Sequence, residues 1–391
     1  AFLREVCDNP LDDAPRLIFA DWLEERGDVR GEFIRLQCDL ESMMEHHPRR
    51  GKAKWKVNQL IKKHGKTWAS NLPSAVRAYD FRRGFVEHVC VAAATMVKQA
   101  EELFALTPAR SLRLTHLKGK ASLVAKSDWL DRITELDFNK MDCKIKEFGP
   151  LLASPRLTNL QELNFDRFKG LGSSQSALTQ LIAETPHLAS LRKFHAYDAG
   201  VSNQKAIQLL ADSPYLRSLE SLSLRANKFG DAGGEPLAQS EILTSIRELD
   251  LSRTGIGDPT LIALANNPHV RGLRKLVLNA NMIGADGLRA LLESPVANTL
   301  EVLALEGNAI DDRGFQALVD CDNLKNLQRL YVGGMETHDE SAKTSEESAK
   351  KLKDAAKRLE EATKRLEESE LAKRLDVLEA RVARSFDGKW G

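Results

Sequence analysis

A leucine-rich phrase recurs along most of the chain at a nearly constant interval. Each copy holds two apolar residues separated by one residue, and the first members are Leu112, Leu136, Leu163, Phe194, Leu222, Leu249, Leu276, Leu303 and Leu330. The intervals are 24, 27, 31, 28, 27, 27, 27 and 27 residues. A second marker keeps the same phase, because a proline precedes five of these pairs by eight residues: Pro155, Pro186, Pro214, Pro268 and Pro295. The sequence therefore predicts an array of similar structural units rather than separate globular domains.

Each unit has the parts of a strand followed by a helix. Alternation of apolar residues predicts a short strand with its leucines on one face. Asn227, Asn281 and Asn308 each stand three residues beyond the second leucine, where a buried amide can satisfy backbone groups at the turn. Gly-Asp turns, a helix with apolar spacing and a proline stop complete the unit. One such unit cannot bury its own leucines, so the units must stack.

This pattern resembles the leucine-rich repeats of the ribonuclease-inhibitor type, over about residues 105–335. The resemblance implies an α/β horseshoe solenoid, with parallel strands on the inner side and helices on the outer side. The pattern weakens toward the N-terminus, where Met141 and Phe168 stand in place of the asparagine. The unit between Pro186 and Pro214 is irregular, and the preceding unit carries the insertion KGLGSSQSA. We therefore expect a bend or a specialised contact in the middle of the array.

The N-terminal segment has a different character. The run DAPRLIFADWLEERGDVRGEFIRLQ, with the later FRRGFVEHVCV, resembles a short helical module found beside leucine-rich repeats in planctomycete bacteria, the repeat-companion domain. The resemblance implies a planctomycete source and a cap on the solenoid, and it supplies no reaction. We predict a helical cap over residues 1–80 and the solenoid over residues 81–335.

A basic stretch lies inside the predicted cap. Residues 46–79 hold nine Lys or Arg residues and no acid, with Trp55, Trp68 and Tyr79 between them. One interpretation is contact with an anionic partner such as nucleic acid, through Arg49, Arg50, Lys52, Lys54, Lys56, Lys62, Lys63 and Lys66. The other is an amphipathic helix whose Trp55, Leu60 and Trp68 pack inward while the lysines face water.

The composition changes again after Met335, and we predict a charged helical or coiled-coil tail over residues 336–391. Its apolar residues follow heptad spacing, in two phases separated at Glu368–Glu370. The predicted assembly helix carries Leu352, Leu359, Leu366, Leu371, Leu375 and Leu378. It could pair with itself, pair with a partner helix or dock on the last repeat. The alternative is a solitary solvated helix or a disordered tail.

Composition and motifs favour no enzyme class. The net charge of +1 selects neither nucleic acid nor membrane, and no apolar run is long enough to span a bilayer. The five cysteines are scattered without a CxxC or zinc spacing, which is typical of reduced thiols in a cytosol. No signal peptide, P-loop, GxSxG or HExxH motif is present. We expect no catalysis, cofactor, metal or membrane contact, and a cytoplasmic location.

The surface of interest is the concave face of the predicted sheet. The side chains that alternate with the strand leucines are acidic in the early units, mixed in the middle and apolar at the end. The predicted partner-binding residues are Glu135, Asp137, Asn139, Glu162, Asn164, Asp166, Lys193, His195, Tyr197, Arg225, Glu248, Asp250 and Tyr331. An acidic wall suits a basic protein segment, with Tyr197 or Tyr331 as an anchor. The alternative is that these polar residues only keep the sheet soluble.

Together these observations predict a non-enzymatic scaffold that binds a protein partner on the concave face. Recruitment or regulation of an effector in bacterial signalling or defence is the role that this architecture suggests. The alternative is a nucleic-acid-associated adaptor that uses the basic segment 46–79, and an enzyme of unrecognised type is the third option.

Overall fold

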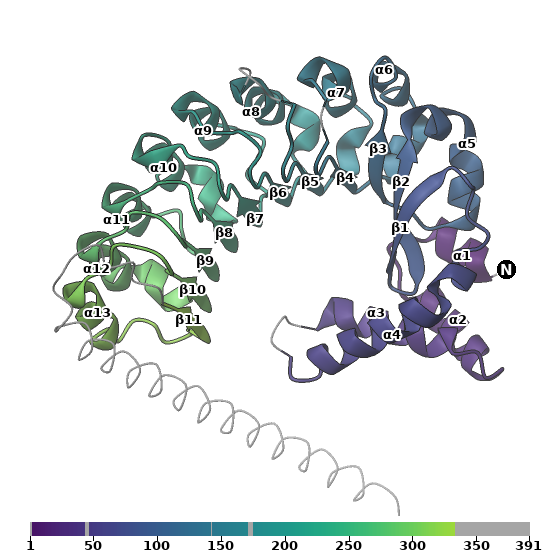
Figure 1. Cartoon of the computed structure of the whole chain (residues 1–391), viewed down its shortest axis with the longest axis horizontal. Helices are drawn as coiled ribbons and strands as arrows, with labels where there is room; N and C mark the ends of the chain where they lie inside the picture. The colour runs from purple at the N-terminus through teal and green to yellow at the C-terminus, as the bar shows by residue number, and fades with distance from the viewer. Residues whose placement is uncertain (1, 44–46, 142, 171–174, 333–391) are drawn as a thin grey trace, which may run out of the picture.

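The computed structural model describes residues 2–43, 47–141, 143–170 and 175–332. These residues form an arc, with the strands along its inner side and the helices of the repeats along its outer side (Figure 1). The predicted solenoid is therefore confirmed. The predicted tail over residues 336–391, including the heptad leucines from Leu352 to Leu378, lies outside the described residues.

A single sheet runs through the whole arc, and its strands follow one another in chain order. β1 pairs with β2 in antiparallel fashion, and every later neighbouring pair is parallel. The register aligns the predicted phrases, as Leu222 opposite Leu249 and Leu276 opposite Leu303 illustrate. The strands are β1 (Val76–Arg82), β2 (Phe85–Ala92), β3 (Ser111–Thr115), β4 (Glu135–Asp137), β5 (Glu162–Asn164), β6 (Lys193–His195), β7 (Ser221–Ser223), β8 (Glu248–Asp250), β9 (Lys275–Val277), β10 (Val302–Ala304) and β11 (Arg329–Tyr331).

Helices precede the sheet and then alternate with its strands. They are α1 (Phe2–Asp8), α2 (Ala14–Glu24), α3 (Arg30–Ser42), α4 (Arg50–Trp68), α5 (Ala93–Leu106), α6 (Ala121–Val124), α7 (Ile145–Leu152), α8 (Gln175–Glu184), α9 (Gln204–Ala211), α10 (Gly230–Ala238), α11 (Asp258–Ala265), α12 (Ala285–Glu293) and α13 (Asp312–Val319). Short 3-10 helices follow several of them, at Asp128–Arg132, Leu157–Asn159, Pro186–Leu188, Glu241–Thr244 and Pro295–Thr299. The marker prolines stand just beyond the helix ends, as the sequence predicted.

The core is the continuous layer between the sheet and the outer helices. The strand leucines Leu222, Leu249, Leu276 and Leu303 and the helix residue Leu288 are at most 2% exposed. Full burial of one such side chain contributes about 1.5–3 kcal/mol. The leucines of one unit pack against those of the next, so each unit depends on its neighbours for this gain.

The predicted asparagines do link the turns of adjacent units. Asn281 donates through Nδ2 to the carbonyl oxygens of Leu251 (2.8 Å) and Leu278 (2.9 Å). Its Oδ1 accepts from the backbone N–H groups of Thr254 (3.0 Å) and Gly255 (2.9 Å) in the preceding unit. Asn227 and Asn308, in two other units, make the corresponding contacts to their own unit and to the preceding one. This prediction is confirmed.

Aromatic packing replaces the asparagines in the early units. Phe138 and Phe165 stack with ring centroids 4.6 Å apart, and Phe168 meets Phe165 edge-on at 5.3 Å. Phe148 from α7 contacts all three rings. Phe168 therefore packs among aromatic rings at the position where the later units have the asparagine.

A buried charge cluster fastens the N-terminal helices to the sheet. Glu87 of β2 contacts Arg16 of α2 at 2.9 Å, Arg83 at 3.0 Å and Arg110 at 3.1 Å. Arg16 is fully buried and Glu87 is 2% exposed, so water screens these contacts poorly. Burial lowers the pKa of Arg16, although the charge of Glu87 works in the opposite direction. The division into a cap over 1–80 and a solenoid over 81–335 remains a prediction, and β1 begins at Val76.

Candidate functional site

The inner face of the arc is the candidate site, and the predicted residues lie along it on or just after β4 to β8 and on β11 (Figure 1). Their side chains point away from the core because each alternates with a buried residue in its strand. Glu135 is buried, whereas Asp137, Asn139, Glu162, Asn164, Asp166, His195, Tyr197 and Asp250 are half-buried and Lys193, Arg225, Glu248 and Tyr331 are exposed.

Three carboxylates of the predicted acidic wall have basic partners on a neighbouring strand. Glu162 lies opposite Lys193 in the register, with Nζ and Oε2 3.5 Å apart. Asp137 contacts Nε of Arg113 at 3.2 Å. Glu248 faces Lys275 in the same way, at 4.0 Å. These pairs reduce the negative field that the sequence alone suggested for the early units.

Glu135 belongs to a buried polar cluster at the N-terminal end of the concave face. Arg82 of the β1–β2 hairpin donates to its two oxygens at 2.5 and 3.3 Å. Burial alone would raise the pKa of Glu135, but hydrogen bonding and charge from Arg82, with Ser111 and His88, hold that pKa below its usual value. Sequence reasoning missed this cluster because Arg82 and Glu135 are 53 residues apart and the hairpin pairing was not foreseen.

Ser111 and His88 in this cluster do not form a catalytic triad. Oγ of Ser111 lies 2.5 Å from Nδ1 of His88, and Oε1 of Glu135 lies 4.0 Å from the same nitrogen. In a Ser–His–acid triad the hydroxyl and the acid contact opposite ring nitrogens. Ser111, His88 and Glu135 are each less than 9% exposed, so a substrate would not reach them.

Basic groups without an acidic partner gather instead in the middle of the concave face. The guanidinium carbon of Arg167 lies 5.2 Å from the ring centroid of Tyr197, and that of Arg225 lies 5.4 Å from it. Both arginines are exposed. Within the described residues, no carboxylate lies within 4.0 Å of either guanidinium or of Arg253. The irregular unit therefore contributes Tyr197 between two unpaired arginines, which come from the units on either side of it.

A left-handed backbone position recurs beside this surface and was not predicted. It falls two residues after the second apolar residue of each phrase, at His116, Lys140, Arg167, Asp198, Ala226, Arg253, Ala280 and Gly307, with φ between 50° and 69°. The backbone N–H at most of these positions donates to a carbonyl of the next unit, for example Ala226 to Ser252 at 2.8 Å. Only the phase of the repeat could have predicted this conformation, because these residues occupy the same position in their units although their residue types differ.

The basic segment forms α4, and one prediction about it is wrong. Leu60 is buried and Trp68 stacks on Phe33, but Trp55 is 64% exposed and does not pack inward. Arg50 is used structurally, donating to the carbonyls of Leu40 and Met43, and Lys56 pairs with Glu32. No ion pair within the described residues engages Arg49, Lys52, Lys54, Lys62, Lys63 or Lys66.

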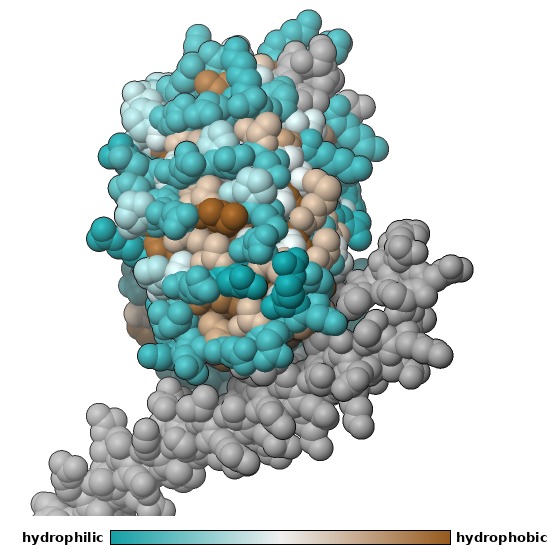
Figure 2. Space-filling view, turned by 90° about the vertical axis from the view of Figure 1, so that its left-hand side faces the viewer, coloured by the Kyte–Doolittle hydropathy of each residue, from teal (hydrophilic) through white to brown (hydrophobic). Residues whose placement is uncertain are grey.

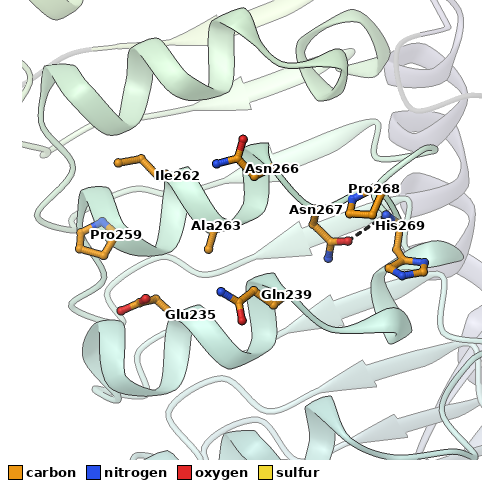
Figure 3. Close-up of a pocket in the computed structure, with 9 residues that line it drawn as sticks. All are labelled: Glu235, Gln239, Pro259, Ile262, Ala263, Asn266, Asn267, Pro268 and His269. Atoms are coloured by element: carbon orange, nitrogen blue, oxygen red, sulfur yellow. Dashed lines mark hydrogen bonds between the residues drawn. The ribbon is translucent and has the colours of Figure 1, made fainter.

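The outer surface offers a second concavity, a groove of about 530 Å³ between α10 and α11 (Figure 3). It is lined by Glu235 from α10, by Pro259, Ile262 and Ala263 from α11, and by residues just beyond these helices, Gln239, Asn266, Asn267, Pro268 and His269. Asn267 accepts the His269 N–H at 2.8 Å and so fixes one wall. Toward the C-terminal end the outer surface is mostly hydrophilic, with small apolar areas (Figure 2).

A metal site and a membrane-spanning helix have no support in the described part of the chain. No group of three or more His, Cys, Asp or Glu residues there could hold a metal ion. None of its helices combines the length and the apolar composition that crossing a bilayer requires. Cys7 and Cys38 are free thiols, and burial raises the pKa of each to about 11.

Comparison with known proteins identifies the repeats. A family model described as Leucine Rich repeat matches residues 215–238, 243–265 and 296–319. A search of curated proteins finds no match. Among solved structures, the Rad7 and Elc1 complex of yeast is 15% identical with a TM-score of 0.37, covering 84% of this chain and 66% of that chain. An internalin (inlF) of Listeria monocytogenes is 16% identical with a TM-score of 0.27, covering 54% and 78%. This chain thus spans just under two thirds of the yeast chain.

Proposed function

We propose that this leucine-rich repeat chain is a non-enzymatic scaffold that binds a protein partner on the concave face of its sheet. The observation that carries the proposal is the open inner face itself. Its strands are held by a buried leucine layer, while most side chains on the other side of the sheet from β5 to β9 are exposed or half-buried. A rigid concave surface lined by varied polar side chains suits recognition of another chain, because little ordering is needed on binding.

The finer assignments belong to the same proposal. Full helices such as α8 and α12 between short strands support the ribonuclease-inhibitor type of repeat. The helices α1 to α4, fastened by the Glu87 cluster, support a cap of the repeat-companion type. A planctomycete source, a cytoplasmic location, a coiled-coil tail and recruitment of an effector in bacterial signalling or defence complete the proposal.

Affinity capture from the native host tests the concave face. The intact chain is compared with a variant carrying Ser221→Trp and Ser223→Trp, which fills the middle of the face without touching the core. The matched control carries Arg289→Trp on the exposed side of α12. We expect the partners to be lost only from the concave variant. Equal recovery by all three proteins would contradict the proposal.

A second candidate function is nucleic-acid association through α4, and the exposure of Trp55 favours it. An exposed indole among unpaired lysines can stack on a base while the lysines neutralise phosphates. Lys52→Glu, Lys54→Glu and Lys62→Glu together should abolish retention of single-stranded RNA and flatten its salt dependence. Lys118→Glu with Lys120→Glu, on an exposed turn, serves as the control. Retention by the α4 variant equal to that of the control would remove this function.

A further inference from the structure

Charge is distributed on the concave face in a way that the sequence did not reveal. Most acids on the concave strands have basic partners, whereas the exposed guanidiniums of Arg167 and Arg225 have no acidic partner among the described residues. We propose that the central basic patch, formed by Arg167, His195, Tyr197, Ser223 and Arg225, binds a short acidic segment of the protein partner. The inference rests on the proposed function and names the chemistry of the segment recognised.

Tyr197 gives the patch its geometry. Its ring contacts both guanidiniums, and its backbone N–H donates to Oδ1 of Asp166 at 2.8 Å. An aromatic ring restricts two otherwise flexible side chains by cation–π contact. Arginine heads ordered before binding lose less entropy when a carboxylate arrives, and each offers a planar fork that can donate two hydrogen bonds.

The floor of the patch carries no acid. His195 of β6 lies opposite Ser223 of β7 in the register, and both side chains are half-buried on the concave side. A serine hydroxyl and an imidazole can each donate a hydrogen bond to a carboxylate held between the arginines. The nearby acids Asp166 and Asp198 are not within ion-pair distance of Arg167 or Arg225 in the described structure.

The surroundings limit how long the acidic segment can be. On one side, Glu162 and Asp137 precede the patch along the sheet, and on the other, Asp250 and Glu248 follow it. Even when paired, these carboxylates offer no attraction to a long polyanion. The patch therefore fits one or two carboxylate side chains of a peptide and not a nucleic-acid strand running along the whole face.

Fluorescence anisotropy of labelled peptides with the full chain tests the inference. The probe is a twelve-residue peptide with a central Glu-Asp-Glu in a Gly/Ser background, beside matched peptides with Gln-Asn-Gln and Lys-Lys-Lys at the centre. We expect the acidic peptide alone to bind, and at least tenfold more weakly to the variant Arg167→Gln with Arg225→Gln. The matched control, Arg271→Gln with Arg289→Gln, removes two exposed charges elsewhere and should bind as the parent does.

The outcomes separate the inference from the proposed function. Binding of all three peptides, an equal loss in the control variant, or tighter and patch-dependent binding of an RNA oligonucleotide would overturn the acidic-segment inference. Host partners lost from the tryptophan-blocked variant but retained by Arg167→Gln with Arg225→Gln would leave the concave-face function standing while refuting this patch. A further variant, Tyr197→Leu, should weaken the acidic peptide while the unfolding midpoint stays within the range of exposed substitutions.

Discussion

The asparagine that links consecutive turns should be the most costly polar side chain to remove from the C-terminal repeats. In Asn281→Ala, the carbonyl of Leu251 keeps the Thr254 hydroxyl at 2.7 Å, and the carbonyl of Leu278 keeps Asn308 at 2.9 Å. The backbone N–H groups of Thr254 and Gly255 lose their acceptor. A buried donor left without a partner costs about 1–3 kcal/mol.

The magnitude follows from how well water can reach each donor. Thr254 is fully buried, so its N–H stays unsatisfied, whereas Gly255 is half-buried and can regain water. We therefore expect Asn281→Ala to lower the free energy of unfolding by about 2–4 kcal/mol. Asn308→Ala should cost about 1 kcal/mol, because Asn308 is half-buried and accepts from one N–H, that of Ile283, at 3.2 Å.

Urea unfolding followed by circular dichroism measures this loss, and hydrogen exchange of the amides at positions 254 and 255 localises it. Both are needed because a repeat array can unfold in parts, and one midpoint then does not describe the whole chain. The control is Asn58→Ala on the exposed side of α4. An Asn281→Ala protein as stable as the Asn58→Ala protein, with unchanged exchange, would refute the reasoning.

Three further predictions follow from the contacts described above. Glu87→Gln should cost about 3–5 kcal/mol and loosen the N-terminal helices, since it leaves three arginines without their shared anion; limited proteolysis with tryptophan fluorescence will show it. Ala280 and Gly307 both have a left-handed backbone conformation, which glycine adopts without the strain that a Cβ brings. Ala280→Gly should therefore stabilise the chain by about 1 kcal/mol, and Gly307→Ala should destabilise it by a similar amount, as measured by thermal unfolding. Burial raises the pKa of the Cys7 and Cys38 thiols from 9.0 to about 11, so in the native chain at pH 8.5 they should react with iodoacetamide on the order of 100-fold more slowly than in urea. The same shift stabilises the fold below pH 9, and this contribution is lost as the pH rises toward 11.

Control substitutions distinguish the expected effects from the general effect of changing a residue of the same type. Glu301→Gln removes a partly exposed partner of Arg274 and should cost less than 1 kcal/mol, roughly the value of a surface pair. Gly272→Ala adds a methyl group in open space at a residue without positive φ, so a change as large as that in Gly307→Ala would contradict the conformational argument. Rapid alkylation of Cys7 in the native chain at pH 8.5 would show that burial does not protect it.

The repeat architecture could be predicted from the sequence because it depends on local signals that recur in every unit. The phase of the leucine pairs gave the strand register, and the spacing of Asn281 and Asn308 gave the links between turns. It predicted the surface less well, because partners such as Arg82 and Glu135 meet only after the hairpin forms. The exposure of Trp55 could not be read from helical spacing, since what packs against α4 is set by tertiary contacts.

Unpaired charge flanks the irregular unit, since Arg167 precedes it and Arg225 follows it along the sheet. Arg167 and Arg253 occupy left-handed positions, which cost a side chain with Cβ about 1–2 kcal/mol relative to the ordinary helical region. Glycine at these positions would relieve that strain, as Gly307 does in the last complete unit. The same strain recurs along the described repeats at side chains as different as His116 and Ala226, so it belongs to the fold and does not by itself distinguish the arginines. What distinguishes Arg167, beside the irregular unit, is an exposed guanidinium without an acidic partner among the described residues. The backbone N–H groups of Arg167 and Arg253 donate to carbonyls of the next unit, so their conformation serves the fold. Their guanidiniums serve no ion pair within the described residues, and this is why they are the groups that we expect a partner to engage.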